Sequence, residues 1–335
     1  MTARHRRSIL RGARIVASIG AFARAPGRAG KERELTGEVP APLRTIDAVM
    51  DDGAIIRVRQ HGNPRGPRLA LSHGNGLAID GYLPFWGPLR ERYELIVFDF
   101  RNHGRNPTHR LDHHNWPRFI GDLEHIFQLV QREFGAKRTA GVFHSLSAVS
   151  ASMHTQRIGA RWDPLVLFDP PFYPRDGHPL REPQTTGENA IAARAEKRTP
   201  SYKDPLELAR QFAKYFTRWQ PEAYELMARA TLRRDDATGD YVLACPREFE
   251  AHVFRSNRDT NAWTAMARMP VAVKLICADP TLEAAAPALI GKALAEEAHL
   301  DYAAIPDTTH FLQIERPAEC IRSMEDFLAQ HGIAA

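Results

Sequence analysis

From Leu43 onward, short apolar runs alternate with helical patterns along the chain. The runs predict buried strands at Arg68–Ser72, Glu94–Phe100, Pro164–Asp169, Val271–Cys277 and His299–Ile305. Between them, apolar residues recur at spacings of three and four, as at residues 119–134, where Gly135 ends the predicted helix. Near-continuous apolar strands alternating with helices are typical of βαβ units, so the pattern predicts an α/β fold with a mostly parallel sheet.

The two ends of this region have different patterns. Thr45–Met50 and Ala54–Gln60 flank Asp51-Asp52-Gly53, which predicts a β-hairpin before the parallel strands. A helix is expected from about Ala318 to His331 at the other end.

The alternation stops between residues 171 and 263, where prolines punctuate a charged stretch. Leu206–Phe216 and Tyr224–Leu232 have helical spacing, so this part is expected to be helical rather than stranded. An insertion between two strands of such a sheet is well placed to be a lid. The predicted organisation is a basic extension (1–40), a core in two parts (43–170 and 264–335) and a helical cap (171–263).

Composition supports a folded chain with an unusual beginning. The 335 residues are 43% apolar and 25% charged, enough for a sizeable core, and no apolar run reaches the roughly 18 residues of a membrane span. Residues 1–34 hold nine Lys/Arg and two Glu, which gives them a net charge of +7. The whole chain carries +5, so the remaining residues carry a net charge of −2. The body therefore gives no reason to expect nucleic acid as a partner.

The basic extension has three interpretations. Arg6-Arg7-Ser8 resembles the start of an export signal, a helix over residues 9–19 would suit a membrane surface, and a poorly ordered tail is the third. The three cysteines are scattered without metal or redox spacing, which favours reduced thiols and a cytoplasmic location. Membrane association and export are the alternatives to a cytoplasmic location if the basic extension is functional.

The candidate chemistry centres on Thr139–Ala151, which reads TAGVFHSLSAVSA. A strand, an abrupt turn and a helix in succession would lift the hydroxyl of Ser145 clear of a sheet. The turn His73-Gly74-Asn75-Gly76 precedes it, and loops containing Asp279 and His310 follow it. Nucleophile, acid and histidine thus occur in the chain order of α/β-hydrolases.

Four matches in this order make the chain resemble the α/β-hydrolases with a helical cap. They are His73-Gly74-Asn75-Gly76, the run from Asp99 to Arg105 (DFRNHGR), His144-Ser145-Leu146, and the run from His310 to Pro317 (HFLQIERP). The resemblance covers roughly Thr45 to the C-terminus. It implies a central, mostly parallel sheet with a cap, and hydrolysis by an activated serine without a cofactor.

The resemblance and the chemistry together suggest a catalytic triad. Ser145 is the expected nucleophile, because a serine hydroxyl attacks only when an imidazole takes its proton, and His310 is the expected base. Asp279, after the strand ending at Cys277, is favoured as the acid, and Asp169, after the preceding strand, is the alternative. A helix-starting serine and turn-capping aspartates are the structural alternatives. Ser147 is the second candidate nucleophile.

The resemblance also implies an oxyanion hole formed by the backbone N–H groups of Asn75 and Leu146. His73, Gly74 and Gly76 are expected to support it by bracing the loop and letting it approach a substrate closely. Phe143 departs from the family pattern, which prefers glycine two residues before the nucleophile. The turn is therefore expected to be more open, or Phe143 to point away from the following helix.

The other polar cluster is expected to be solvated. Asp112-His113-His114, with His103 and His109 nearby, has donor types suited to a metal, but such spacing in a polar loop is typical of a surface. We therefore expect neither metal nor cofactor.

The sequence thus predicts a serine hydrolase that cleaves a small ester, thioester or lactone through an acyl-enzyme. A hydrolase-fold protein that only binds a small molecule or partner is the first alternative, since fold alone does not secure function. A membrane-surface lipase or lysophospholipase and a carbon–carbon bond hydrolase are further alternatives. The substrate and the oligomeric state stay open.

Overall fold

The computed structural model describes residues 38–282 and 286–335, so the basic extension up to residue 37, with its three interpretations, lies outside it. The strands are β1 (Arg44–Val49), β2 (Ile55–Gly62), β3 (Arg68–Ser72), β4 (Glu94–Phe98), β5 (Thr139–His144), β6 (Leu165–Phe168), β7 (Ser201–Tyr202), β8 (Leu232–Arg234), β9 (Tyr241–Leu243), β10 (Val273–Cys277) and β11 (Asp301–Ala304). The α-helices are α1 (Leu83–Trp86), α2 (Trp116–Glu133), α3 (Leu146–Ile158), α4 (Arg181–Ala195), α5 (Pro205–Tyr215), α6 (Pro221–Thr231), α7 (Arg247–Ser256), α8 (Ala286–Ala298), α9 (Leu312–Glu315) and α10 (Pro317–Gln330).

Eight strands form the central sheet in the order β1-β2-β4-β3-β5-β6-β10-β11. The predicted hairpin β1–β2 is antiparallel, and β2 pairs antiparallel with β4. From β4 to β11 every neighbouring pair is parallel. The predicted α/β architecture with a mostly parallel sheet is therefore confirmed, and β5 lies near its centre.

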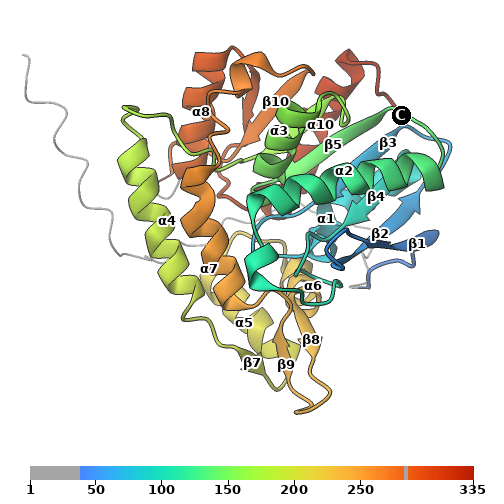
Figure 1. Ribbon diagram of the computed structural model, residues 1–335, viewed down its shortest axis with the longest axis vertical. Coiled ribbons are helices and arrows are strands. Elements are labelled where there is room, and N and C mark those ends of the chain that lie inside the picture. Colours follow the sequence, from blue (N-terminus) through green and yellow to red (C-terminus); the bar gives the residue numbers. More distant parts are fainter. Residues whose placement is uncertain (1–37, 283–285) are drawn as a thin grey trace, which may run out of the picture. The chain divides into compact units, whose positions relative to one another are not determined.

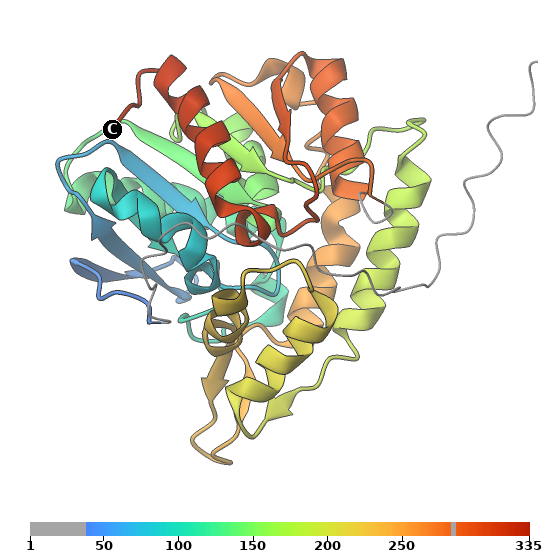
Figure 2. The same ribbon diagram turned by 180° about the vertical axis from the view of Figure 1, so that it is seen from behind.

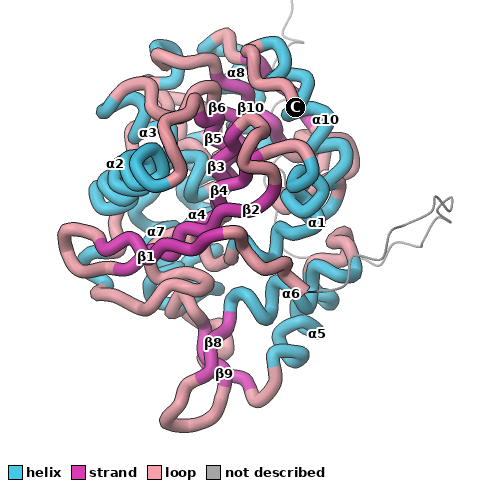
Figure 3. The backbone as a smooth tube through the Cα atoms, turned by 90° about the vertical axis from the view of Figure 1, so that its right-hand side faces the viewer, coloured by secondary structure: helices cyan, strands magenta, loops and turns pink. Residues whose placement is uncertain are grey.

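Helices cover both faces of this sheet, as Figures 1 and 2 show from opposite sides. Side chains alternate along the strands, so Phe98 and Phe143 join one apolar layer with α2, α3 and α8, whereas Val97 and Val142 join the other layer with α1 and α10. Figure 3 shows the sheet edge-on between α2 and α3 on one side and α1 and α10 on the other. Burial on both faces explains why the strands read as unbroken apolar runs.

The chain between β6 and β10 contains α4 to α7, with α4 and α7 side by side (Figure 1). The helices expected at residues 206–216 and 224–232 are present as α5 and α6. The expectation of helices alone was wrong, because β7, β9 and β8 form a small antiparallel sheet. These strands are two or three residues long, too short to produce an alternating pattern.

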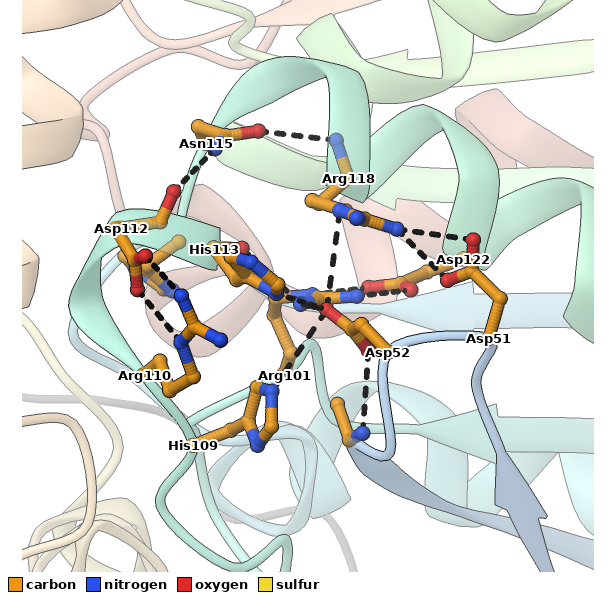
Figure 4. A network of polar contacts seen from close by, with 12 residues as sticks. Asp51, Asp52, Arg101, His109, Arg110, Asp112, His113, Asn115, Arg118 and Asp122 are labelled. Carbon is orange, nitrogen blue, oxygen red and sulfur yellow. Dashed lines mark hydrogen bonds and ion pairs between the residues drawn. The ribbon is translucent and has the colours of Figure 1, made fainter.

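A buried ion-pair network joins the β1–β2 turn to the loop after β4 and to α2 (Figure 4). The guanidinium of Arg101, in the loop after β4, donates to Asp52 in the β1–β2 turn at 2.7 Å and to Asp122 in α2 at 2.6 Å. All three side chains are nearly inaccessible to solvent. Removing one partner would leave a buried charge uncompensated. The network therefore fixes the β1–β2 turn against the loop after β4.

None of the helices in the two described ranges is both long and apolar enough to cross a bilayer.

Candidate active site

Ser145 lies at a strained turn between β5 and α3. Its φ of 53° and ψ of −113° are rare for a residue with a side chain, whereas its N–H still donates to the Phe168 carbonyl at 3.0 Å. The helix starts at the next residue, so the serine stands at the carboxyl edge of the sheet. This strand–turn–helix geometry is the one that exposes a nucleophilic hydroxyl in α/β-hydrolases.

The bulky Phe143 is accommodated by packing back along its own strand. Its ring packs edge-on against Phe98 and Trp162 and lies over Gly141, where an added Cβ would come within 2.6 Å of the ring. The expectation that Phe143 points away from the following helix was wrong, because its side chain lies in the same apolar layer as α3. The missing space is instead supplied two residues earlier by Gly141.

Ser147, the second candidate nucleophile, is occupied within the turn. Its Oγ accepts from the N–H of His144 at 3.0 Å and donates to the carbonyl of the same residue at 2.9 Å. The side chain is fully buried. This hydroxyl therefore holds the turn closed through the backbone of His144.

Three side chains from separate loops meet at the turn. The Oγ of Ser145 lies 3.0 Å from Nε2 of His310, and Nδ1 of His310 lies 2.7 Å from Oδ2 of Asp169. A carboxylate only accepts hydrogen bonds, so Nδ1 carries the proton and Nε2 has its lone pair toward the serine. Asp169 also accepts from the Ala278 N–H at 3.1 Å and is inaccessible to solvent.

The preference for Asp279 as the partner of His310 was wrong, and the alternative, Asp169, occupies that place. The carboxylate of Asp279 instead accepts from the N–H of Thr281 at 2.9 Å and of Asp307 at 2.9 Å. Its own N–H donates to the Thr308 carbonyl at 3.1 Å. These bonds hold the chain that leads to His310. The Thr281 hydroxyl, which donates to the same carboxylate at 2.6 Å, and the two backbone N–H groups lower the pKa of the Asp279 carboxyl.

The turn after β3 lies against the serine. Gly74 packs so closely that an added Cβ would come within 3.1 Å of the Ser145 Cβ. His73 is inaccessible to solvent, donates from Nδ1 to the Gly74 carbonyl at 2.8 Å, and accepts from the Phe100 N–H at 3.1 Å. Gly76 adopts a φ of +70° and donates its N–H to Nε2 of His103 at 3.1 Å.

The backbone N–H groups of Asn75 and Leu146 make no hydrogen bond within residues 38–282 and 286–335. Asn75 follows Gly74, and Leu146 is the first residue of α3. An N–H group at a helix start has no acceptor within its helix. Both groups are therefore free to donate to an incoming oxygen.

The insertion between β6 and β10 reaches this turn. The side-chain amide of Asn75 donates to the Glu250 carbonyl in α7 at 2.9 Å, and the Glu250 carboxylate lies against Gly76, where it pairs with Arg198. The insertion is also attached to the His310 loop, since the side chain of Gln220 donates to the Glu315 carbonyl at 2.8 Å. The same segment therefore supports both loops that flank Ser145.

A buried carboxyl joins α4 to the residue that follows α7 within the insertion. Oε1 of Glu188 accepts hydrogen bonds from the side-chain amides of Gln184, at 2.9 Å, and Asn257. Asn257 also donates to the Pro171 carbonyl at 2.7 Å, two residues beyond Asp169. Burial raises the pKa of Glu188 to about 7, because amides compensate a negative charge poorly.

One group of metal-type donors in the described chain consists of His103, His114 and Cys245, all buried. Both ring nitrogens of His103 are already engaged, with the Arg101 carbonyl at 2.9 Å and the Gly76 N–H. Burial lowers the pKa of His103 to about 3 and raises that of the Cys245 thiol, which therefore stays protonated. Both nitrogens that His103 could offer to a metal are thus engaged in hydrogen bonds, and a protonated Cys245 thiol is a poor metal ligand.

The second group, Asp52, His109 and His113, lies in the network of Figure 4. The same carboxylate oxygen of Asp52 that receives Nδ1 of His113 at 2.8 Å lies 2.7 Å from Arg101 and 3.8 Å from Arg118. Two guanidinium groups would repel a metal cation there. His113 and His109 thus belong to a salt-bridge network rather than to a freely solvated loop.

The sequence analysis did not single out Tyr82 or the side chain of His144. The hydroxyl of Tyr82 lies 2.7 Å from Nδ1 of His144 and 3.2 Å from the N of Gly74. His144 could have been noticed because it precedes the candidate nucleophile. Tyr82 occurs in a short helical turn without a motif, and only the tertiary structure brings it to the site.

Comparisons with known proteins agree with this geometry. Residues 69–323 match the model of the alpha/beta hydrolase family, so the chain belongs to this family. No curated protein sequence matches the chain.

Solved structures with the same fold are distant in sequence. E-2-(acetamidomethylene)succinate hydrolase is 18% identical, with 85% of this chain and 100% of that chain covered and a TM-score of 0.70. The thioesterase domain from the curacin biosynthetic pathway is 15% identical, with 84% and 99% covered and a TM-score of 0.65. A thermophilic esterase from Thermogutta terrifontis is 15% identical, with 86% and 99% covered and a TM-score of 0.62.

Proposed function

We propose that this member of the alpha/beta hydrolase family is a serine hydrolase that cleaves small carboxylic esters or thioesters with Ser145, His310 and Asp169. The observation that carries the proposal is the hydrogen-bonded chain from Ser145 through His310 to Asp169 at a strained strand–helix turn. A serine next to a correctly oriented imidazole is the arrangement that nucleophilic acyl transfer requires.

In this mechanism, the Oγ of Ser145 attacks the carbonyl carbon while Nε2 of His310 takes the hydroxyl proton. The negative charge of Asp169 stabilises the imidazolium and keeps its orientation. The N–H groups of Asn75 and Leu146 donate to the oxyanion. His310 then returns the proton to the leaving alcohol or thiol, and a water molecule, activated by the same imidazole, releases the acid from Ser145.

We assign residues 171–263 to a cap over this site. Its contacts with Asn75 and Gly76 support the assignment, because they place the insertion at the carboxyl edge of the sheet. Ser145 is only 5% exposed, which suits a small substrate enclosed between core and cap. The ester and thioester classes are those of two of the distant structural neighbours.

Labelling with a fluorophosphonate tests the proposal, with hydrolysis of p-nitrophenyl acetate as a second readout. We expect stoichiometric labelling of the native protein and none of Ser145→Ala. Ser152→Ala is the matched control, since it removes a buried hydroxyl of α3 that donates to the Ala148 carbonyl of the same helix, and it should leave labelling in place. Folded native protein that neither reacts with the probe nor cleaves the ester would favour a binding role instead.

A further inference from the structure

His144 connects the two loops on either side of Ser145. Its imidazole is fully buried, and both ring nitrogens are hydrogen bonded. Nε2 lies 2.8 Å from the backbone carbonyl of His310, and Nδ1 lies 2.7 Å from the hydroxyl of Tyr82, which in turn lies 3.2 Å from the N of Gly74. One continuous chain therefore runs from the Gly74 turn to the backbone of the proposed base.

The proton positions along this chain follow from elimination. Burial and the neighbouring His310 lower the pKa of His144, so its imidazole is neutral. The His310 carbonyl only accepts, so Nε2 of His144 carries the hydrogen and Nδ1 has the lone pair. Nδ1 then accepts from the Tyr82 hydroxyl, and the oxygen of Tyr82 accepts from the Gly74 N–H. This arrangement satisfies every donor and acceptor.

The chain also fixes the peptide that holds the N–H of Asn75. The Gly74 carbonyl accepts from Nδ1 of His73 at 2.8 Å and from the Leu77 N–H at 3.2 Å, whereas the Gly74 N–H is held by Tyr82. Because the peptide group is planar and trans, the N–H of Asn75 points opposite to the Gly74 carbonyl. Holding both polar groups of Gly74 therefore sets the direction of the Asn75 N–H.

We infer that Tyr82 and His144 are positioning residues that hold the oxyanion donor of Asn75 and the base His310 in register around Ser145. The inference rests on the proposed function. Neither side chain exchanges a proton with the substrate. Each acts through hydrogen bonds to backbone groups on opposite sides of the nucleophile, so that one imidazole sets the distance between the two loops.

Simple core packing is the competing explanation, because the rings of Tyr82 and His144 are also in contact, with centroids 5.6 Å apart. Tyr82→Phe separates the two, since it keeps the ring and removes the hydroxyl. Tyr93→Phe is the matched control: Tyr93 is also a buried tyrosine, and burial together with Glu325 raises its pKa to about 12. Loss of a buried hydroxyl is common to both variants, and only the first breaks the chain.

The experiment measures kcat and KM for p-nitrophenyl acetate and, separately, hydrogen exchange at the Gly74 amide. For Tyr82→Phe we expect kcat to fall at least about tenfold with KM nearly unchanged, because the donor acts on the transition state. Exchange at Gly74 should become faster, since its acceptor is lost. Tyr93→Phe should change neither. An unchanged kcat, or unchanged exchange at Gly74, in Tyr82→Phe would overturn the inference.

Hydrogen exchange does not depend on catalysis, so the two proposals fail differently. An inactive native protein overturns the hydrolase, whereas faster exchange in Tyr82→Phe would still establish the link between the loops. His144→Gln and His144→Leu add a rescue test. The glutamine amide keeps a donor for the His310 carbonyl, so it should retain at least about tenfold more kcat than leucine. Equal activities would contradict a positioning role for His144.

Discussion

The loops after the neighbouring parallel strands β6 and β10 contain the same dipeptide, Asp169-Pro170 and Asp279-Pro280, yet the two aspartates have different roles. Asp169 is sealed from solvent and faces one ring nitrogen of His310. Asp279 is only partly buried and accepts backbone hydrogen bonds from its own turn and from Asp307. The same dipeptide thus yields a partner for His310 in one place and a turn cap in the other, because the surroundings of the two aspartates differ.

The largest expected effect is on kcat and comes from replacing the buried aspartate, Asp169. Asp169→Asn should lower kcat by about 10⁴-fold, the loss seen when a serine protease triad loses this charge, because the amide favours the wrong imidazole tautomer. Steady-state hydrolysis of p-nitrophenyl acetate measures it, and circular dichroism should show an intact fold. Near-native activity of this variant would return the role of acid to Asp279.

Glu188 sharpens the contrast, because it is buried like Asp169 but faces amides instead of an imidazole. Its pKa is raised, so this carboxyl contributes to the stability of the fold fully below its unfolded-state pKa near 4.5. The contribution is lost as the pH rises through the folded-state pKa of about 7. The free energy of unfolding should therefore fall by roughly 3 kcal/mol between pH 4.5 and pH 8 through this group.

Glu188→Gln should remove this pH dependence, since glutamine keeps the shape and the acceptor without ionising. Denaturant unfolding at several pH values measures it, with the two curves converging at low pH. Parallel curves for the variant and the native protein across this pH range would contradict the assignment.

The smallest effect on kcat is expected from replacing Asp279. Asp279→Asn keeps one acceptor oxygen and loses a charge that solvent screens, so kcat should change by less than about tenfold through a shift of the His310 loop. The melting temperature should fall slightly. The same kinetic assay and a thermal scan provide the comparison with Asp169→Asn.

Much of the core was predictable because its apolar periods are local. The parallel strands, α2 and the turn at Ser145 each follow from a few consecutive residues. The choice between Asp169 and Asp279 was not local, since both follow strands that lie side by side. Which carboxylate reaches His310 depends on strand order and on the path of the last loop, and neither is written in one stretch of sequence.

The same limit applied elsewhere at the site. Phe143 departs from the family pattern, and the compensating Gly141 became recognisable only once the ring was seen above it. Tyr82 reaches His144 from a helical turn 62 residues earlier in the chain. Such contacts join side chains that are far apart in the sequence, so no local periodicity or motif predicts them.

The attachment of one inserted segment to both loops beside Ser145 has a consequence for timing. Lifting the segment would remove the Glu250 carbonyl from Asn75 and pull Gln220 from the Glu315 carbonyl in a single movement. Movement of the segment would therefore change the surroundings of the Asn75 turn and of the chain after His310 together rather than one at a time.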